Sequence, residues 1–456
     1  MKKVLKNLIP ILIIIGLCGV LIFMVSILLK DNSNSSYPND EKPNSSMMSA
    51  PGEKTENSSS VEYSSAKEIT ESTTIKNENF SSDTADENAV TVSGDVDATI
   101  EGSTIQKTGD SDGGDNTSFY GTNSAVIAKG GANLTLKNLT VTTNAKGANG
   151  VFSYGGSATT NNSSSDGTQV TISDSKITTT ADNSGGIMTT GGGIMKASNL
   201  TVNTSGTSSA AIRTDRGGGT VTVDGGSYST TGKGSPAVYS TADVTVNNAK
   251  LVAEQSEGLI VEGKNSITIN NCDVTDTNNS LNGKSTTYKN IFLYQSMSGD
   301  ASEGKASFTA NNSKITTNKG DTIYVTNTSA VIKLTNNTIV NNDSTGNFLR
   351  AQKDSWGKSG SNGGNVILTM SNQSVTGNIV IDSISTLDMT MESNSYYEGT
   401  INGDNSAKSI SLKLDNNSKI KLTGDSYVTS LDDSDSSYSN IDFNGYKLYV
   451  NGNAIN

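Results

Sequence analysis

The sequence predicts an all-β chain that folds as a right-handed parallel β-helix, a β-solenoid of about thirteen coils. The first observation is a repeated pattern, apolar–Thr–apolar followed by an Asn-rich corner, as in residues 267–274. Its first and third positions are apolar in all thirteen copies, and its second is Thr in nine. This alternation is typical of a strand with one buried face and one solvent face. The copies begin at residues 98, 134, 170, 195, 221, 244, 267, 308, 332, 368, 389, 412 and 441.

The second observation is the fifth position of the pattern, which is Gly, Asn or Asp in twelve of the thirteen copies. These residues tolerate a left-handed backbone conformation, so each copy predicts a corner after its strand. The third observation is spacing: uninterrupted copies lie 21 to 26 residues apart, which is enough for three short strands and three turns. Such repetition predicts parallel coils stacked about 4.8 Å apart, and its length favours the right-handed β-helix over the left-handed kind built on hexapeptide repeats.

Residues 1–30 predict a cytoplasmic tip followed by a transmembrane signal anchor. The apolar run from Leu8 to Leu29 is long enough to span a bilayer, and the lysines before it favour a cytoplasmic N-terminus. A lipoprotein attached through Cys18 and a cleaved signal peptide are the alternatives. Leu17 stands where a lipoprotein needs a small residue, however, and no small-x-small cleavage site follows the apolar run.

Residues 31–89 predict a disordered linker, because they are rich in Ser and Asn and have too few apolar residues to offset the entropy of ordering. The β-helix is then expected over residues 90–456, with the copy at 441 ending the stack. An anchor, a spacer and a stack of coils are typical of a protein held outside a membrane. We therefore expect a single-pass protein of the cell membrane with an extracellular β-helix, as on a Gram-positive type of bacterial surface.

The composition argues against several function classes. The chain has 456 residues, a net charge of −12 and no His. Its acidity disfavours a nucleic-acid partner, which needs a concentrated basic surface. The absence of His removes most His-dependent acid–base and metal chemistry. The two cysteines, Cys18 and Cys272, give no disulfide framework.

A second family of short strands, such as Gly258-Leu-Ile-Val-Glu, lies between the threonine-bearing strands. The second residue of each should point inward, and the third should then point outward. The third positions are unusually apolar for a solvent-facing column, and we expect this stripe to be an exposed binding floor. The stripe consists of Ile127, Phe152, Met188, Arg213, Tyr239, Ile260, Phe292, Tyr324, Leu349 and Val380.

Insertions gather on both sides of the same strands, at residues 106–124, 155–168, 276–289, 295–306 and 352–365. We expect them to form walls around the floor, because loops on a rigid scaffold usually carry function. The alternative is that they fold over the stripe and bury it as a second core. The expected ligand-binding residues are Phe152, Tyr154, Arg213, Asp215, Tyr239, Glu262, Phe292, Tyr294, Tyr324 and Trp356, with Asp382 at the edge.

The repeat over residues 90–456 resembles that of bacterial cell-surface right-handed parallel β-helix proteins, the adhesin-like members of the pectate-lyase-like superfamily. The resemblance rests on the repeat itself, so it bears on fold more than on function. It implies a ligand held along one sheet between turn insertions, which here is the stripe. The superfamily includes polysaccharide lyases, glycoside hydrolases, carbohydrate-binding modules and adhesins.

The resemblance also allows the catalytic motifs of the superfamily's enzymes to be compared with the residues of this chain. The hydrolase branch uses paired Asp residues with a Gly-His-Gly motif, which this His-free chain lacks. The lyase branch uses calcium-binding carboxylates and an Arg or Lys base. A surface ion pair beside a glycine turn is the favoured explanation of the best local match. That match consists of Arg213, Asp215, Arg216, Asp224 and Glu262.

Two acidic clusters are weak candidates for calcium. Asp110, Asp112 and Asp115 resemble an oxygen-rich calcium loop, and residues 432–435 form a similar cluster. Neither matches a complete calcium-loop pattern. Ca²⁺ is therefore the single candidate cofactor, and no other cofactor is expected.

The function expected from the sequence is that of a surface-anchored binding or adhesion protein, not an enzyme. Its partners would be a polysaccharide or another cell's surface, recognised along the stripe, and the membrane through residues 8–29, with no nucleic acid. A calcium-dependent polysaccharide lyase and a passive structural stalk are the alternatives.

Overall fold

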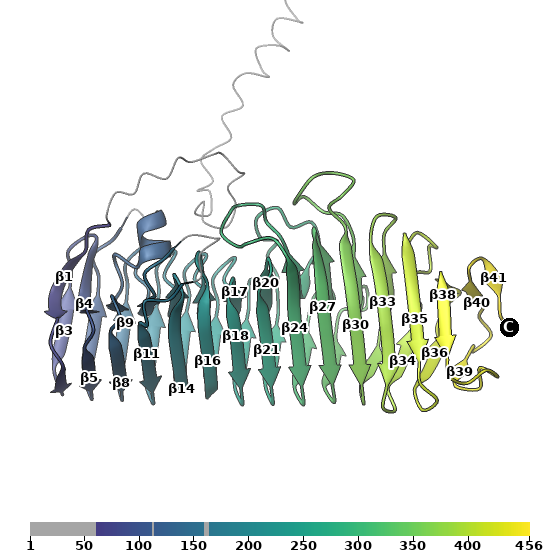
Figure 1. The fold of residues 1–456 in the computed structure, drawn as a ribbon, viewed down its shortest axis with the longest axis horizontal. Helices are drawn as coiled ribbons and strands as arrows, with labels where there is room; N and C mark the ends of the chain where they lie inside the picture. Colours follow the sequence, from purple (N-terminus) through teal and green to yellow (C-terminus); the bar gives the residue numbers. More distant parts are fainter. Residues whose placement is uncertain (1–60, 112–113, 159–163) are drawn as a thin grey trace, which may run out of the picture. The chain divides into compact units, whose positions relative to one another are not determined.

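The computed structural model describes residues 61–111, 114–158 and 164–456. Over these residues the chain is built of strands that wind into stacked parallel sheets, which confirms an all-β, solenoid-like fold. Successive coils place their strands side by side from β1 to β38 (Figure 1). The expected anchor at residues 1–30 and residues 31–60 of the expected linker lie outside the described ranges. Within those ranges, no helix is long and apolar enough to cross a membrane.

Sheet A is the twelve-stranded sheet, and it takes one strand from each coil along most of the stack. All its pairings are parallel. Its strands, in spatial order, are β1 (Ser64–Ile69), β4 (Glu87–Ser93), β7 (Val126–Lys129), β10 (Val151–Tyr154), β13 (Ile187–Thr190), β15 (Ile212–Thr214), β17 (Val238–Ser240), β20 (Leu259–Glu262), β23 (Lys289–Tyr294), β26 (Asp321–Thr326), β29 (Leu349–Ala351) and β32 (Ile379–Ile381).

Sheet B has twenty-two strands and consists of two ladders that meet at the Asn-rich corner. We call the first the threonine ladder. It contains β2 (Thr73–Lys76), β5 (Asp97–Glu101), β8 (Asn133–Lys137), β11 (Gln169–Ser173), β14 (Gly193–Thr204), β16 (Gly219–Thr230), β18 (Asp243–Asn247), β21 (Ser266–Asn270), β24 (Lys305–Asn311), β27 (Thr328–Thr335), β30 (Gly364–Ser371), β33 (Thr386–Glu392), β35 (Ser409–Leu414) and β38 (Ser430–Asp433).

The second ladder of sheet B continues each coil after the corner. The long strands β14 and β16 pass through the corner and belong to both ladders. The other strands of the second ladder are β3 (Asn79–Ser82), β6 (Thr104–Lys107), β9 (Thr140–Thr143), β12 (Lys176–Thr179), β19 (Lys250–Ala253), β22 (Asp273–Asp276), β25 (Lys314–Thr317) and β28 (Thr338–Asn341).

The C-terminal coils close with two small sheets. A four-stranded sheet contains β31 (Ser374–Thr376), β34 (Tyr396–Gly399), β36 (Lys419–Leu422) and β39 (Ile441–Asp442). A three-stranded sheet contains β37 (Ser426–Val428), β40 (Leu448–Val450) and β41 (Asn453–Ala454), of which the last two pair antiparallel. The short π-helix η2 (Asn116–Tyr120) lies in the insertion that precedes β7.

The corner residues have the predicted backbone. Residues at the fifth position of the repeat have positive φ in twelve of the thirteen copies, for example 52° at Asn138 and Asn271 and 50° at Asn312, and Asn416 is the exception. Even Ser393, the exception in composition, has φ 58°. Asn side chains also bond from coil to coil along this edge, as from Asn336 to Asn312 at 2.7 Å.

The core lies inside the coils and is lined by the first and third positions of the repeat. Residues such as Ile100, Ile172, Ile269 and Leu334 have no exposed surface, and they belong to one continuous apolar cluster. Their register runs unbroken from coil to coil, so each coil buries its apolar residues against its neighbours.

Three expectations about boundaries and register are wrong. The stack begins at Ser64 in β1, not at residue 90, because the polar strands β1–β3 gain their order by pairing with the next coil. The copy at 441 is not in the threonine ladder: Leu431 pairs with Leu412 there, whereas Ile441 pairs with Ile420 in the four-stranded sheet.

The third error is a register shift in β29. Leu349 pairs with Ile323 and points inward, and Arg350 pairs with Tyr324 on the outer face. Leu349 is therefore a core residue and not a member of the outward stripe. Phe348, which was expected to point inward within the strand, precedes β29 and is also buried.

Candidate functional site beneath the insertions

The outer column of sheet A is covered along most of its length, so the expected exposed binding floor is wrong. Phe152, Met188 and Tyr324 have no exposed surface, and Tyr239 and Phe292 are 1% and 3% exposed. By register the column consists of Thr91, Ile127, Phe152, Met188, Arg213, Tyr239, Ile260, Phe292, Tyr324, Arg350 and Val380.

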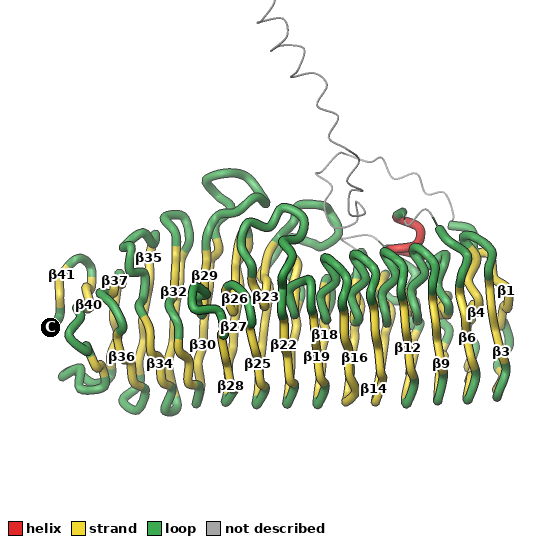
Figure 2. Tube along the Cα trace, turned by 180° about the vertical axis from the view of Figure 1, so that it is seen from behind, coloured by secondary structure: helices red, strands yellow, loops and turns green. Residues whose placement is uncertain are grey.

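The insertions provide the cover, as the alternative interpretation of the stripe predicted. They rise along one edge of the stack, where the longest loops are drawn in green (Figure 2). One buried cluster joins Ile127, Phe152 and Met188, with Tyr63 and Tyr154 against them. A second cluster contains Ala210, Tyr239, Ile260, Phe292, Tyr294, Tyr324 and Trp356. The outer face of sheet A therefore forms two satellite cores.

Trp356 was expected to contact a ligand from its insertion, but it packs onto the protein's own rings. Its ring centroid lies 5.3 Å from that of Phe292 and 5.3 Å from that of Tyr294. Phe292 and Tyr294 stack on each other at 4.3 Å. Such contacts add to the free energy gained by burying the rings.

Charged side chains are buried beside these rings. The Nζ atom of Lys289 lies 4.3 Å from the ring centre of Phe292 and 4.7 Å from that of Tyr324, and its side chain has no exposed surface. Its carboxylate partner is Glu257, whose Oε1 is 3.8 Å away. A buried amine of this kind is held by an anion and by ring faces together.

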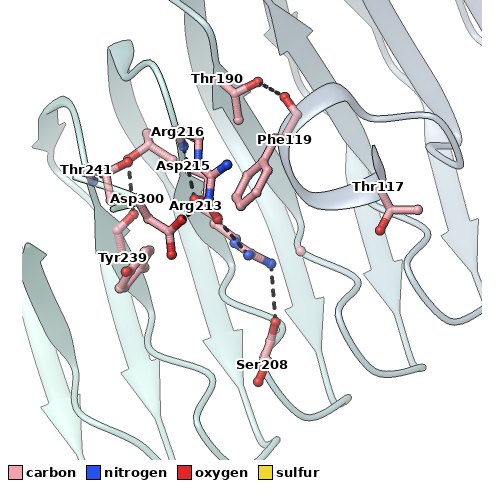
Figure 3. Close-up of polar contacts among 12 residues, drawn as sticks. Thr117, Phe119, Thr190, Ser208, Arg213, Asp215, Arg216, Tyr239, Thr241 and Asp300 are labelled. Carbon is pink, nitrogen blue, oxygen red and sulfur yellow. Dashed lines mark hydrogen bonds and ion pairs between the residues drawn. The ribbon is translucent and has the colours of Figure 1, made fainter. Parts of the chain in front are cut away.

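A second charged group lies over β15 and the turn that follows it (Figure 3). Arg213 donates to Asp215 at 2.7 Å, and neither side chain is more than 1% exposed. Arg216 donates to Asp300 at 2.7 Å. Burial raises the pKa of Asp215 to about 7 and also raises the pKa of Asp300, although the guanidinium groups oppose both shifts.

Arg216 connects two insertions that are distant in the sequence. Its guanidinium lies 3.9 Å from the ring centre of Phe119 in η2, and it bonds Asp300 in the insertion after β23. The backbone carbonyl of Phe119 also accepts a hydrogen bond of 2.7 Å from Thr190 of β13 (Figure 3). These contacts fasten both loops to sheet A.

Glu262, at the end of β20, is the centre of a third group. It accepts hydrogen bonds from the hydroxyls of Tyr239, Tyr294 and Ser296, the one from Tyr294 at 3.0 Å. Burial raises the pKa of Glu262, and the three hydroxyl donors partly offset this. The group fixes the start of the insertion that contains Ser296.

The insertion between β29 and β30 is held in the same way. Tyr324 donates to Asp354 at 2.6 Å, and Asn362 donates to the backbone carbonyl of Trp356 at 2.8 Å. Asp354 also accepts a hydrogen bond of 3.1 Å from Thr286, which belongs to the insertion before β23. Two insertions are thus joined above the column.

The sequence did not single out Phe119, Glu257, Lys289, Asp300 or Asp354. All but Glu257 lie in or at the ends of insertions that were expected to be walls, and a charged residue beside an aromatic column was a usable signal. Their pairing was not predictable, because Asp300 and Arg216 are 84 residues apart and meet through the stacking of coils.

The residues named for a lyase are brought together only in part. Arg213, Asp215 and Glu262 lie in the buried layer, whereas Asp224 is exposed on the threonine ladder. Arg213, the candidate base, has no exposed surface and donates to Asp215. The geometry therefore gives the lyase alternative no support. The surface ion pair considered for these residues is instead a buried one.

The calcium candidates are used in other contacts or lie outside the described ranges. Asp110 accepts a hydrogen bond of 2.8 Å from the backbone of Lys146, and Asp112 is not among the described residues. Asp115 precedes η2, and Asp435 accepts from Ser437. Among the described residues, no group of three or more Cys, Asp or Glu side chains is arranged to hold a metal ion.

Small cavities flank the insertion after β23. One of about 200 Å³ is lined by Gly218, Lys264 and Asp300, and one of about 230 Å³ by Gln295 and Asn327 among others. Both are below the volume usual for a site that encloses a drug-sized ligand. A ligand held at this insertion would therefore contact its exposed loop surface.

Comparison with known proteins places no relative beside this chain: no family model, curated protein or solved structure matches it. The fold and the candidate site together describe a solenoid of parallel coils in which insertions cover the outer face of sheet A.

Proposed function

We propose that this chain is a membrane-anchored binding protein of a bacterial cell surface, and that it recognises an anionic polysaccharide through the insertions that cover sheet A. The insertions would be carried on a right-handed β-helix, the hand favoured for parallel crossovers by strand twist. The observation that carries the proposal is the buried network beneath the loops. It fixes their conformation before any ligand binds, which lowers the entropic cost of binding.

The ligand class follows from the charge of the two joined insertions. Their exposed charged residues are Lys284, Lys353 and Lys358, and the acidic side chain of Asp354 is half-buried and hydrogen-bonded. The chain as a whole has a net charge of −12. A local excess of lysine on an acidic protein favours a polyanion at that place, with an affinity that decreases as salt is added.

The test uses purified full-length protein and immobilised anionic and neutral polysaccharides. A triple substitution of Lys284, Lys353 and Lys358 by Ala should abolish binding to the anionic polymer. The matched control replaces Lys196, Lys333 and Lys413 by Ala, since these lysines are exposed on the threonine ladder. The control changes net charge equally and should retain binding. Equal loss in both variants, or no binding by the parent, would refute the proposal and leave the passive stalk.

The anchor is tested separately, because residues 1–30 lie outside the described ranges. Mass spectrometry of the chain extracted from membranes should find the original N-terminal segment, as an uncleaved signal anchor requires. A chain that begins after residue 29 would show a cleaved signal peptide, and a lipid on Cys18 would show a lipoprotein. Either result would contradict the uncleaved anchor.

A further inference from the structure

The insertion before β23 places an amine and a carboxamide against the two oxygens of one carboxylate. The Nζ atom of Lys289 lies 3.8 Å from Oε1 of Glu257. Asn282 donates through Nδ2 to Oε2 of the same carboxylate at 3.1 Å. Glu257 is therefore located between the other two side chains, with one oxygen toward each. Its own side chain is 4% exposed.

Burial shifts the amine toward its neutral, nucleophilic form, although the amine also pairs with Glu257. Lys289 is enclosed by Phe292, Tyr324 and Trp356. Burial lowers its pKa, an effect that the charges of Glu257, Asp354 and Asp321 only partly oppose. Nζ donates to Ser285 Oγ and to the carbonyl of Thr287, each at 2.9 Å, and these contacts keep it beside Glu257. A desolvated lysine is a reactive nucleophile.

The carboxamide of Asn282 is hydrogen-bonded on its nitrogen side alone, where Nδ2 also donates to the carbonyl of Gln255 at 3.4 Å. The Oδ1 atom of Asn282 is buried and has no hydrogen-bond partner among the described residues. An unmade hydrogen bond of this kind costs free energy in the folded state. Both reacting groups are thus held next to a proton-transfer group, Lys289 fully buried and Asn282 partly so.

We infer that Lys289 and Asn282 form an intramolecular amide cross-link, assisted by Glu257. Neutral Nζ would attack Cγ of Asn282 after rotation of the lysine side chain away from Ser285. Glu257 would accept the proton from Nζ and deliver it to Nδ2 of Asn282. The Nζ–Cγ bond forms, the Cγ–Nδ2 bond breaks, and one molecule of ammonia leaves. No oxidant or reductant is needed, because the step exchanges one amide for another.

The cross-link would close the insertion that contains Lys284 and hold its tip on sheet A. It would restrict the unfolded chain as any covalent closure does, and it would resist mechanical opening of this loop. The inference concerns covalent structure alone, so it stands or fails independently of the proposed ligand.

The experiment is intact-mass and peptide-mapping spectrometry of the purified full-length protein. The parent should be lighter than its sequence by the mass of one ammonia molecule. Trypsin should cleave after Lys284 but not after Lys289, which gives a branched peptide that joins residues 265–284 to residues 285–305. The variants Lys289→Arg and Glu257→Gln should have their full sequence masses and give only linear peptides.

One other reaction must be distinguished. Asn282 precedes Gly283, so its side chain could lose ammonia by closing onto the backbone. That product would persist in Lys289→Arg and would give no branched peptide. A parent of unmodified mass, or a loss of ammonia that survives in Lys289→Arg, would overturn the inference.

Discussion

The two outer faces of the solenoid follow the same alternation but have opposite surroundings. On the threonine ladder, the outward column contains residues such as Thr245, Thr268 and Thr309, which are half-exposed. On sheet A, the corresponding column contains Tyr239, Phe292 and Tyr324, which are buried. Backbone pairing is parallel and in register on both faces.

The difference shows that strand periodicity determines which way a side chain points, whereas exposure depends on the rest of the chain. The outward residues of sheet A are apolar because the insertions cover them. In the described part of the threonine ladder, outward threonines such as Thr268 stay half-exposed, so β-branched polar residues suffice there. Burying the charged side chains beneath the insertions costs free energy unless each of them has a partner. Their pairing therefore specifies one conformation of each loop.

The largest difference between the two faces should appear when one outward residue of each is truncated. Phe292→Ala should lower the free energy of unfolding by about 3–5 kcal/mol, because it removes a ring packed against Tyr294 and Trp356. Thr268→Ala should change it by about 0.5 kcal/mol or less. Urea unfolding of both variants measures the difference, and equal effects would show that the outer face of sheet A is not a core.

A smaller effect is expected from Arg216→Ala. The substitution leaves the carboxylate of Asp300 buried without its cation, and it removes the contact with Phe119. Since Arg216 is partly exposed, water moderates the loss, and we expect about 1–3 kcal/mol. Hydrogen exchange should become faster in both insertions, near η2 and at residues 295–304. Lys333→Ala on the threonine ladder is the control and should leave exchange unchanged. Faster exchange in one insertion alone would contradict the bridging role.

The smallest effect is a dependence on pH. Burial raises the pKa of Glu262, so the folded chain keeps a proton that the unfolded chain releases at about pH 4.3. Stability is therefore lost as pH rises from that value through the higher pKa of the folded state, by about 1.4 kcal/mol for each pH unit that separates the two pKa values. Glu262→Gln should make the slope shallower over this window. Thr268→Ala, on the exposed ladder, removes no titrating group and should leave the slope unchanged, and the reverse pattern would contradict the burial of Glu262.

Much of the fold was predictable because the repeat encodes it locally. Alternation identified the inward residues, and Asn138 or Asn271 marked a corner, since few other residues adopt positive φ without strain. The ends of the stack were harder to predict. Strands β1–β3 are as polar as a linker, and they are ordered by the coil beside them.

The position of the aromatic column was predicted from the sequence, but its burial was not. The sequence located the aromatic column, the insertions and Trp356 correctly relative to one another, because each follows from its place in a coil. Whether a loop stands beside a sheet or lies over it depends on long-range pairs such as Arg216 with Asp300 and Tyr324 with Asp354. No local pattern encodes those pairs, and a register error of one residue at Leu349 misassigned the outward residue of β29.

The most direct test of the covered face is the fluorescence of Trp356, the chain's single tryptophan. Its side chain is 5% exposed and packs on Phe292 and Tyr294. The native protein should therefore emit at short wavelength and resist quenching by acrylamide, and both properties should be lost on unfolding in urea. Native emission at the wavelength of a solvated indole, with quenching as strong as in the unfolded chain, would contradict the account.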